Sequence, residues 1–300
     1  MRHLLEIDDL TPQELRHLCD LAVVPPADLE QTLARQGVAC VFTKPSARTR
    51  NSTEMAVVQL GGHPVYITAD EVGIDTRETA EDVARTFACY HRVLCARVHD
   101  HRVLERMAAL DVLPVVNLLS DDGHPLQALA DILTIEAEYG TIEGRVVTYV
   151  GDANNVARSL TLAVGYLGGE MRVASPPGYG FSEVDAGRLR VAGVDVALFD
   201  RPAEAIDGAD VIYTDTWISM GQEAERADRL RAFEGFMVDE RLMAAAGHAV
   251  FLHCLPAHRG EEVSDAVLDG DRSRIWNQAA NRLAAVRAVL AWITDGSGGG

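Results

Sequence analysis

Residues 38–50 read VACVFTKPSARTR, an apolar run of strand length, a turn containing proline, and the beginning of a helical pattern. A strand that leads into a helix is the repeating unit of parallel α/β sheets, so this stretch decides the fold class. The hydroxyls of Ser46 and Thr49 and the backbone N–H groups of the turn can bind an anion at the positive end of the helix. Arg48 and Arg50 add forked donors that match phosphate oxygens, although an exposed basic turn would show the same pattern.

The same alternation of short apolar runs and helical periodicity continues along the rest of the chain. Helices are expected over residues 79–90, 125–138, 156–167 and 274–293, where apolar positions recur three and four apart. Strands are expected at 38–42, 64–67, 93–97, 114–117, 145–150, 171–175, 194–198, 209–214 and 249–253. We therefore predict doubly wound α/β architecture, with parallel sheets that carry helices on both faces.

A polar stretch with two glycines, residues 136–144, separates four predicted strands from five. It predicts two domains, residues 1–138 and 139–273, with the helix at 274–293 joined to the first domain and a flexible tail at 294–300. Ligands of such sheets bind at the carboxyl ends of strands, where the strand order reverses. We therefore expect the two sheets to face each other across an active-site cleft.

The net charge of −18 disfavours nucleic acid and anionic membrane surfaces as partners, but it permits a small anionic ligand in a basic cleft. The sequence shows no apolar run of membrane-spanning length and no signal peptide, which indicates a soluble, cytoplasmic protein. The five cysteines include no CxxC pair, as expected for reduced thiols. Because there is no Walker loop, GxGxxG loop or metal-spaced cluster, we predict neither a cofactor nor a metal.

Polar residues follow the predicted strands in both domains. In the first domain Arg97 ends a strand, and His124 and Gln127 lie three apart at a helix start, where both can face one ligand. In the second domain the residues at strand ends are Asn154, Asn155, Asp215 and Cys254. Basic groups on one side and amide, carboxylate and thiol groups on the other suit group transfer between two small molecules. The alternatives are a capping role for His124 and a buried apolar role for Cys254.

These residues belong to segments that resemble the aspartate/ornithine carbamoyltransferase family, and its ornithine branch in particular. The segments are FTKPSARTR (42–50), QLGGH (59–63), HPLQALAD (124–131), DTWISMGQE (215–223) and HCLPAHRG (253–260). The first and third are typical of the whole family, and the last two are typical of the ornithine branch. The resemblance covers nearly the whole chain. It implies carbamoyl transfer from carbamoyl phosphate to the δ-amine of L-ornithine, through a tetrahedral intermediate, giving L-citrulline and phosphate.

The resemblance also implies roles for individual residues. For carbamoyl phosphate they are Ser46, Ala47, Arg48, Thr49, Arg97, His124, Gln127, Cys254, Leu255 and Arg282, and for ornithine they are Asn155, Asp215, Ser219 and Met220. The catalytic residues among them are Arg97, His124, Cys254 and Arg282. Family members that use the loop at residues 72–78 form trimers with sites at the subunit interface, so a homotrimer or a multiple of trimers is expected.

Four positions depart from the family pattern. Ala47 stands where a Thr is usual, Thr53 where a Phe is usual, Ala280 where a Glu is usual, and Gly73 where the family has a Gln that reaches a neighbouring subunit's phosphate site. Arg77 is a candidate to replace that Gln. The alternative functions are therefore a carbamoyltransferase for another amine, such as putrescine or N-acetylornithine, and a catalytically weak homologue with an assembly or regulatory role.

Overall fold

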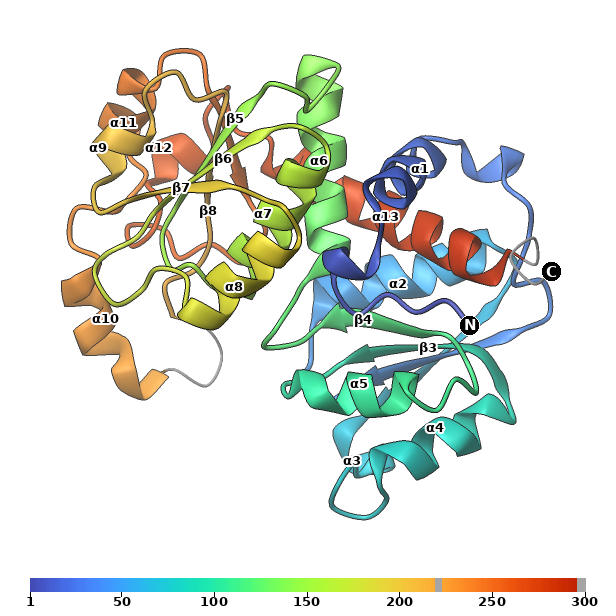
Figure 1. Ribbon diagram of the computed structural model, residues 1–300. Helices are drawn as coiled ribbons and strands as arrows, with labels where there is room; N and C mark the ends of the chain where they lie inside the picture. The colour runs from blue at the N-terminus through green and yellow to red at the C-terminus, as the bar shows by residue number, and fades with distance from the viewer. Residues whose placement is uncertain (219–222, 296–300) are drawn as a thin grey trace. The chain divides into compact units, whose positions relative to one another are not determined.

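The computed structural model describes residues 1–218 and 223–295 (Figure 1). Within these residues nine strands form two sheets, and all pairings between neighbouring strands are parallel. The chain divides into two compact units, one of Met1–Ala130 with the C-terminal segment from Asn281, and one of Asp131–Ala280. The prediction of two parallel-sheet α/β domains is confirmed.

The first unit holds a sheet of four strands. These are β1 (Gly37–Phe42), β2 (His63–Thr68), β3 (His91–Arg97) and β4 (Val115–Leu119), in the order β2-β1-β3-β4. The helices of this unit include α1 (Pro12–Ala22), α2 (Ala47–Gln59), α3 (Ala69–Val72), α4 (Ala80–Ala88) and α5 (His101–Ala108). Alternate side chains of β1 and β3 pack with those of α4 and α5 in one buried cluster, and α2 lies on the opposite face of the sheet (Figure 1).

Helix α2 begins at the turn that the sequence predicts to bind an anion. Ser46 is the N-cap, and its hydroxyl accepts a hydrogen bond from the Thr49 backbone N–H at 3.3 Å. A cap of this kind takes only part of the N–H groups in the first turn, so the others remain directed out of the helix end. Because β1 is buried along nearly its whole length, it fixes the point at which this turn leaves the sheet.

The second unit holds a sheet of five strands. These are β5 (Val146–Val150), β6 (Glu170–Ala174), β7 (Val196–Phe199), β8 (Val211–Thr214) and β9 (Val250–His253), in the order β7-β6-β5-β8-β9. Its helices include α7 (Asn155–Tyr166), α8 (Glu183–Val191), α9 (Pro202–Ala205), α10 (Arg226–Ala232), α11 (Glu240–Ala245) and α12 (Asp265–Leu268). The strand order reverses between β5 and β8, so the loops after these strands lie where such sheets bind ligands.

Helices α6 (Pro125–Tyr139) and α13 (Ile275–Thr294) each contain residues of both units, so the units divide inside these helices. The boundary predicted in the polar stretch at 136–144 lies slightly further along the chain. In the first unit, the Arg287 guanidinium of α13 donates to Gln59 Oε1 at 2.9 Å and to the Ala22 and Val24 carbonyls at 3.0 Å. Residues 296–300 of the predicted tail lie outside the described residues.

The predicted strands are present in the described part of the chain, and their ends shift for local reasons. The strand expected at 194–198 begins at Val196, because the Val194 N–H instead donates to the Leu189 carbonyl at 2.9 Å and closes the turn after α8. The helix expected at 79–90 begins at Ala80, because the Thr79 hydroxyl accepts from the Asp82 N–H at 3.1 Å and caps it.

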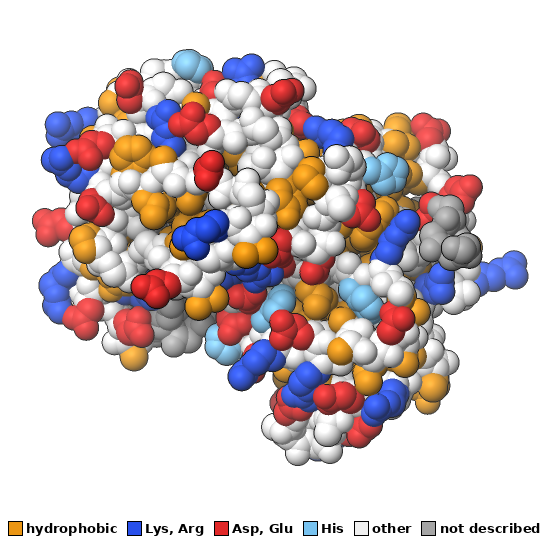
Figure 2. Space-filling model, in the orientation of Figure 1, with side chains coloured by type: hydrophobic (Ala, Val, Ile, Leu, Met, Phe, Trp, Pro, Cys, Tyr) orange, Lys and Arg blue, Asp and Glu red, His pale blue; other side chains and the backbone are white. Residues whose placement is uncertain are grey.

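Two surface properties bear on possible partners. Acidic and basic side chains are interspersed on the face of the molecule seen in Figure 2. None of the helices formed by the described residues combines the length and the hydropathy needed to cross a membrane.

The cysteines are free thiols, and burial raises the pKa of Cys40 to about 12. A buried thiol of this kind behaves as a small apolar side chain.

Candidate active site

In the first unit, the loop after β1 and the end of β3 bring a buried cation to two hydroxyl groups. Arg97 ends β3 and is only 7% exposed, and its Nη1 donates to Thr49 Oγ1 at 3.3 Å. The Ser46 hydroxyl donates to the same Thr49 oxygen at 3.1 Å. A guanidinium and hydroxyls at a helix N-terminus form an arrangement that suits a phosphate.

The two arginines of the predicted anion-binding turn lie in different surroundings. Arg50 turns toward its own helix, where its Nε donates to Glu54 Oε1 at 2.8 Å and its guanidinium lies 3.7 Å from the centre of the Tyr66 ring. Arg48 and Ala47 are exposed in the first turn of α2. Arg50 is therefore committed to contacts within the chain, and Arg48 is the better candidate for an external anion.

The start of α6 and the middle of α13 bring three further predicted residues into contact. His124 and Gln127 are 3% and 1% exposed. Arg282 donates from Nη1 to Gln127 Oε1 at 2.5 Å and to His124 Nε2 at 3.2 Å. These two side chains orient Arg282, although Ala280 stands where the family usually has a Glu. The polar residues gathered in the first unit are called the donor cluster below, a name that refers to a group-donating substrate and not to hydrogen bonding. They are Ser46, Thr49, Arg97, His124, Gln127 and Arg282.

The His124 imidazole is neutral at physiological pH. Burial lowers the pKa of His124 well below its usual value, and the positive charges of Arg282 and Arg97 lower it further. Because Arg282 donates to Nε2, the ring proton lies on Nδ1. A neutral imidazole can donate one hydrogen bond to a carbonyl oxygen, and the two arginines supply the positive charge of the cluster.

The neutral state of His124 predicts a pH dependence of folding stability. The folded chain keeps His124 neutral where the unfolded chain protonates it, so stability falls as the pH drops below about 6.5. The slope from this residue approaches about 1.4 kcal/mol per pH unit. Between pH 7 and pH 5 the thermal midpoint should fall more steeply for the wild type than for His124→Asn. Parallel profiles for the two proteins would contradict the neutral assignment.

In the second unit, residues that follow β5, β8 and β9 meet around the carboxylate of Asp215. Asp215 follows β8 and is 6% exposed. Its Oδ1 accepts from Cys254 Sγ at 3.0 Å, and its Oδ2 accepts from Asn154 Nδ2 at 3.1 Å. The Asn154 side chain also caps α7, where its Oδ1 accepts from the N–H groups of Val156 and Ala157. Partners on both sides thus fix the orientation of the carboxylate.

The predicted ornithine-binding residues fall into two groups in the structure. Asp215 takes part in the contacts described above, together with Cys254, whereas Asn155 is the half-buried first residue of α7. Asn154, which carries the contact to Asp215, was recognised at its strand end, but the resemblance assigned the ornithine-binding role to its neighbour Asn155. Its N-cap position is the signal that could have distinguished it from Asn155. Ser219 and Met220 lie outside the described residues.

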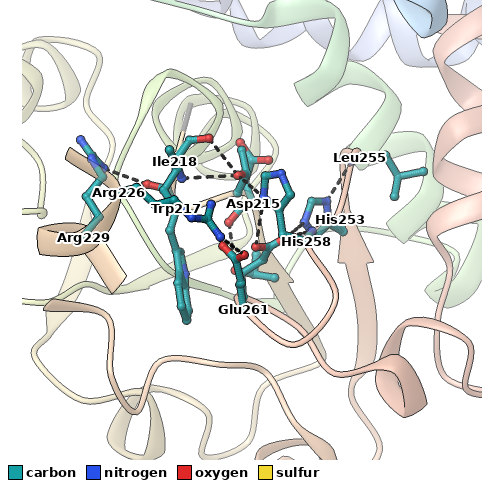
Figure 3. A network of polar contacts seen from close by, with 12 residues as sticks. Asp215, Trp217, Ile218, Arg226, Arg229, His253, Leu255, His258 and Glu261 are labelled. Atoms are coloured by element: carbon teal, nitrogen blue, oxygen red, sulfur yellow. Dashed lines mark hydrogen bonds and ion pairs between the residues drawn. The ribbon is translucent and has the colours of Figure 1, made fainter. Parts of the chain in front are cut away.

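His253 and Glu262, to which the sequence assigned no role, hold the loop after β9. Leu255 has a φ of 60°, which is uncommon for a leucine. Its N–H donates to His253 Nδ1 at 2.9 Å (Figure 3). His253 Nε2 therefore carries the ring proton and donates to Glu262 Oε1 at 3.2 Å. Both His253 and Glu262 are fully buried. The pair therefore fixes the backbone beside Cys254. We call Asn154, Asp215, Cys254 and Leu255 the acceptor cluster.

The fold assembles a group of possible metal ligands that sequence spacing did not reveal. Ligand atoms of Asp215, His253 and Cys254 lie within 4.8 Å of one another. Each of these side chains already takes part in hydrogen bonds within the chain: Cys254 with Asp215, and His253 with Leu255 and Glu262. We therefore assign no metal to this group, and the absence of a metal requirement stays a prediction.

The loop at residues 72–78 leaves little room for a side chain at position 73. Gly73 has a φ of 57°, and a Cβ added there would lie 2.9 Å from the Cβ of Arg77. A glutamine at this position would be strained by the backbone and crowded by that side chain. Arg77 is exposed, and its Nη1 donates to the Asp70 carbonyl at 3.3 Å.

Comparison with known proteins identifies the family that shares this organisation. The family models described as "Aspartate/ornithine carbamoyltransferase, carbamoyl-P binding domain" and "Aspartate/ornithine carbamoyltransferase, Asp/Orn binding domain" match residues 2–137 and 143–293. An ornithine carbamoyltransferase of Thermus thermophilus is 46% identical, over 96% of this chain and 95% of that protein. An anabolic ornithine carbamoyltransferase of Pyrococcus furiosus is 43% identical, over 98% and 97%.

Solved structures show the same likeness. The ornithine carbamoyltransferase from Pyrococcus furiosus superposes with a TM-score of 0.93 at 42% identity, over 98% of this chain and 97% of that one. An acetylornithine transcarbamylase complexed with acetylcitrulline superposes with a TM-score of 0.87 at 28% identity, over 98% and 99%. These matches in sequence and fold extend over both units, and the chain belongs to the aspartate/ornithine carbamoyltransferase family.

Proposed function

We propose that this protein transfers the carbamoyl group of carbamoyl phosphate to the δ-amine of L-ornithine, which gives L-citrulline and phosphate. The observation that carries the proposal is the Asp215 carboxylate, which is 6% exposed and oriented by Asn154 and Cys254. A buried carboxylate attracts the ammonium group of an amino acid and repels a second carboxylate. It therefore favours ornithine over aspartate as the acceptor within this family.

The donor cluster would hold carbamoyl phosphate. We assign the phosphate to Ser46, Arg48, Thr49 and the Ala47 backbone, the bridging position to Arg97, and the carbamoyl group to His124, Gln127, Arg282 and the carbonyls of Cys254 and Leu255. The buried contact of Arg97 with Thr49 and the contacts of Arg282 with His124 and Gln127 support these roles. Transfer requires donor and acceptor clusters to reach one pair of substrates.

The acceptor cluster would hold ornithine. Asp215 would bind the α-ammonium, with Asn155, Ser219 and Met220 around the rest of the amino acid. Cys254 and Asp215 would orient the δ-amine, which must be neutral to attack the carbonyl carbon. No covalent intermediate on the thiol is proposed.

The reaction would proceed by direct attack of that amine. The attack creates a tetrahedral centre with an anionic oxygen and a positively charged nitrogen. The C–O bond to phosphate then breaks, and the nitrogen loses one proton, which the departing phosphate can accept. Arg97 and Arg282 supply positive charge and His124 supplies an N–H donor for the developing oxyanion, which is usually the largest contribution to catalysis. The arginines would also stabilise the departing phosphate, so the step needs no metal or organic cofactor.

The proposal also covers the pathway, the compartment and the oligomeric state of the protein. We assign it to arginine biosynthesis in the cytoplasm, as a homotrimer or a multiple of trimers. The anabolic relative from Pyrococcus furiosus and the free cysteines support this setting. Sedimentation of the purified protein at a mass of three or more chains is the expected result, and a monomer would contradict the assembly.

Arg77 would supply, in place of the missing Gln, a hydrogen-bond donor to a neighbouring subunit's phosphate site, and it would add a positive charge there. Its exposed side chain on the tight loop at 72–78 supports this role. Arg77→Ala should raise KM for carbamoyl phosphate about tenfold, because one charged hydrogen bond is lost. The exposed Arg85 of α4 provides the control, and Arg85→Ala should leave this KM unchanged. Equal KM values for Arg77→Ala and the wild type would remove Arg77 from the site.

The acceptor is tested by a panel of amines. Purified protein is incubated with carbamoyl phosphate and, separately, ornithine, N-acetylornithine, putrescine, lysine and aspartate, and carbamoylated product and phosphate are measured together. Product with ornithine alone is the expected result. The likeness to acetylornithine transcarbamylase makes N-acetylornithine the second candidate, but acetylation removes the positive charge that Asp215 would bind. Folded protein that gives no product with any acceptor would favour a non-catalytic homologue.

A further inference from the structure

Arg229, which the reaction as proposed does not use, is a buried cation in the second unit. It lies in α10, and its side chain is 8% exposed. Its Nη1 donates to the Trp217 carbonyl at 2.9 Å (Figure 3). The same Nη1 donates to Asp152 Oδ2 at 2.7 Å, and its Nε donates to Glu225 Oε2 at 3.0 Å. One guanidinium thus joins the loop after β5 to the loop after β8.

An aromatic ring lies over the same guanidinium. It lies 5.1 Å from the centre of the Tyr179 ring, and the Tyr179 carbonyl accepts from the Ala153 N–H at 2.9 Å. The Trp217 ring stacks on Phe233 with ring centres 5.1 Å apart. Arg229 has little freedom to adopt another position, so the separation between Asp152 and Trp217 is set by this side chain.

The Asp152–Arg229 pair is largely removed from water. Burial raises the pKa of Asp152, the nearby charges of Asp215 and Glu225 raise it further, and Arg229 opposes the rise. Loss of Arg229 would therefore leave a buried carboxylate without its cation, next to a second carboxylate. Such a site relaxes by protonation or by movement of the loop.

Both segments that Arg229 joins continue directly into the acceptor cluster. Asp152 lies two residues before Asn154, and Trp217 lies two residues after Asp215. The contact between Asn154 Nδ2 and Asp215 Oδ2 at 3.1 Å spans the same two loops. We propose that Arg229 is a positioning residue that sets the affinity for the amino-acid acceptor. It fixes the positions of Asp215 and Asn154 relative to each other without touching the substrate.

This inference rests on the proposed function, and its test separates the two. KM values for ornithine and for carbamoyl phosphate are measured for the wild type, Arg229→Gln, Asp152→Asn and the double variant. We expect about a tenfold rise in the ornithine KM for each single variant, with the KM for carbamoyl phosphate within twofold of the wild type. The double variant should be no worse than the worse single variant, because both changes break one interaction.

A matched control lies at the opposite edge of the same sheet. Arg145 Nη1 donates to Asp210 Oδ1 at 3.2 Å, and the Arg145 guanidinium lies 4.8 Å from the centre of the Tyr139 ring. The pair therefore has the same chemistry at the amino ends of β5 and β8. Arg145→Gln should lower the thermal midpoint and leave both KM values unchanged. An equal rise in the ornithine KM for Arg145→Gln would show general destabilisation and overturn the inference.

Two further outcomes distinguish a failure of the proposed function from a failure of the role proposed for Arg229. A wild type that forms no citrulline contradicts the proposed function, whereas an active wild type with an unchanged ornithine KM in Asp152→Asn contradicts the role of Arg229. Asp152→Asn keeps the shape of the side chain, so it provides the answer if Arg229→Gln does not fold. Arg229→Lys should restore part of the ornithine affinity, because it keeps the charge and loses the fork.

Discussion

Replacing Arg97 with glutamine should lower kcat by about 100- to 1000-fold. Arg97 is 7% exposed at the end of β3 and donates to Thr49 Oγ1 at 3.3 Å, so its charge lies in a site of low water content. Removal of one preorganised donor from a developing oxyanion typically has an effect of this size. Glutamine is two bonds shorter than arginine, so the variant removes both the charge and the contact between Arg97 Nη1 and Thr49 Oγ1.

The measurement is steady-state formation of citrulline by Arg97→Gln and by a control variant. Arg92 lies at the other end of the same strand and is exposed, so Arg92→Gln should keep wild-type kcat. The KM for carbamoyl phosphate should also rise for Arg97→Gln, because the assigned position bridges phosphate and carbamoyl oxygen. A kcat within threefold of the wild type would show that Arg97 does not stabilise the transition state.

Asp215→Asn should lower kcat/KM for ornithine about 100-fold and leave the KM for carbamoyl phosphate nearly unchanged. Asparagine keeps the size of the side chain but loses the charge that would bind the α-ammonium, and one hydrogen bond to a charged group is lost. The Cys254 thiol would lose its ionic acceptor at the same time. The expected loss therefore concerns the acceptor alone.

A control for this variant lies in the segment just before the same strand. Asp210 is 8% exposed, against 6% for Asp215, and it precedes β8 at the edge remote from the acceptor cluster. Asp210→Asn should reduce thermal stability, because Asp210 accepts from Arg145 and from the Val146 N–H, and it should not alter ornithine kinetics. If both variants lowered kcat/KM for ornithine equally, Asp215 would have no specific part in acceptor binding.

The fold class could be predicted because its signal is local. Each β-strand and the helix after it occupy one short stretch, as β1 and α2 do at residues 37–59, and their hydrophobic periods differ. The division between the units was harder to predict because it lies inside α6 and α13, and a continuous helix contains no turn residues that would mark a boundary. Turn residues at 136–144 mark the end of α6.

The candidate site was predictable where a residue sits at a strand end or in a family segment. Arg97, His124 and Asp215 satisfy one or both conditions, and the structure buries all three. Glu262 and Arg229 satisfy neither, because a glutamate and an arginine in charged stretches look like ordinary surface residues. Their roles depend on which loops are neighbours, and this follows from the order β7-β6-β5-β8-β9, which hydrophobic periodicity does not encode.

The most direct test of the account follows one labelled atom. Wild-type protein is given L-ornithine and carbamoyl phosphate that carries ¹⁸O at the oxygen bridging carbon and phosphorus, and citrulline, phosphate and the label are measured over time. Direct attack of the amine on the carbonyl carbon predicts equal amounts of citrulline and phosphate, with the label in the phosphate. Release of phosphate without citrulline, or label recovered in the carbamoyl product, would contradict the account.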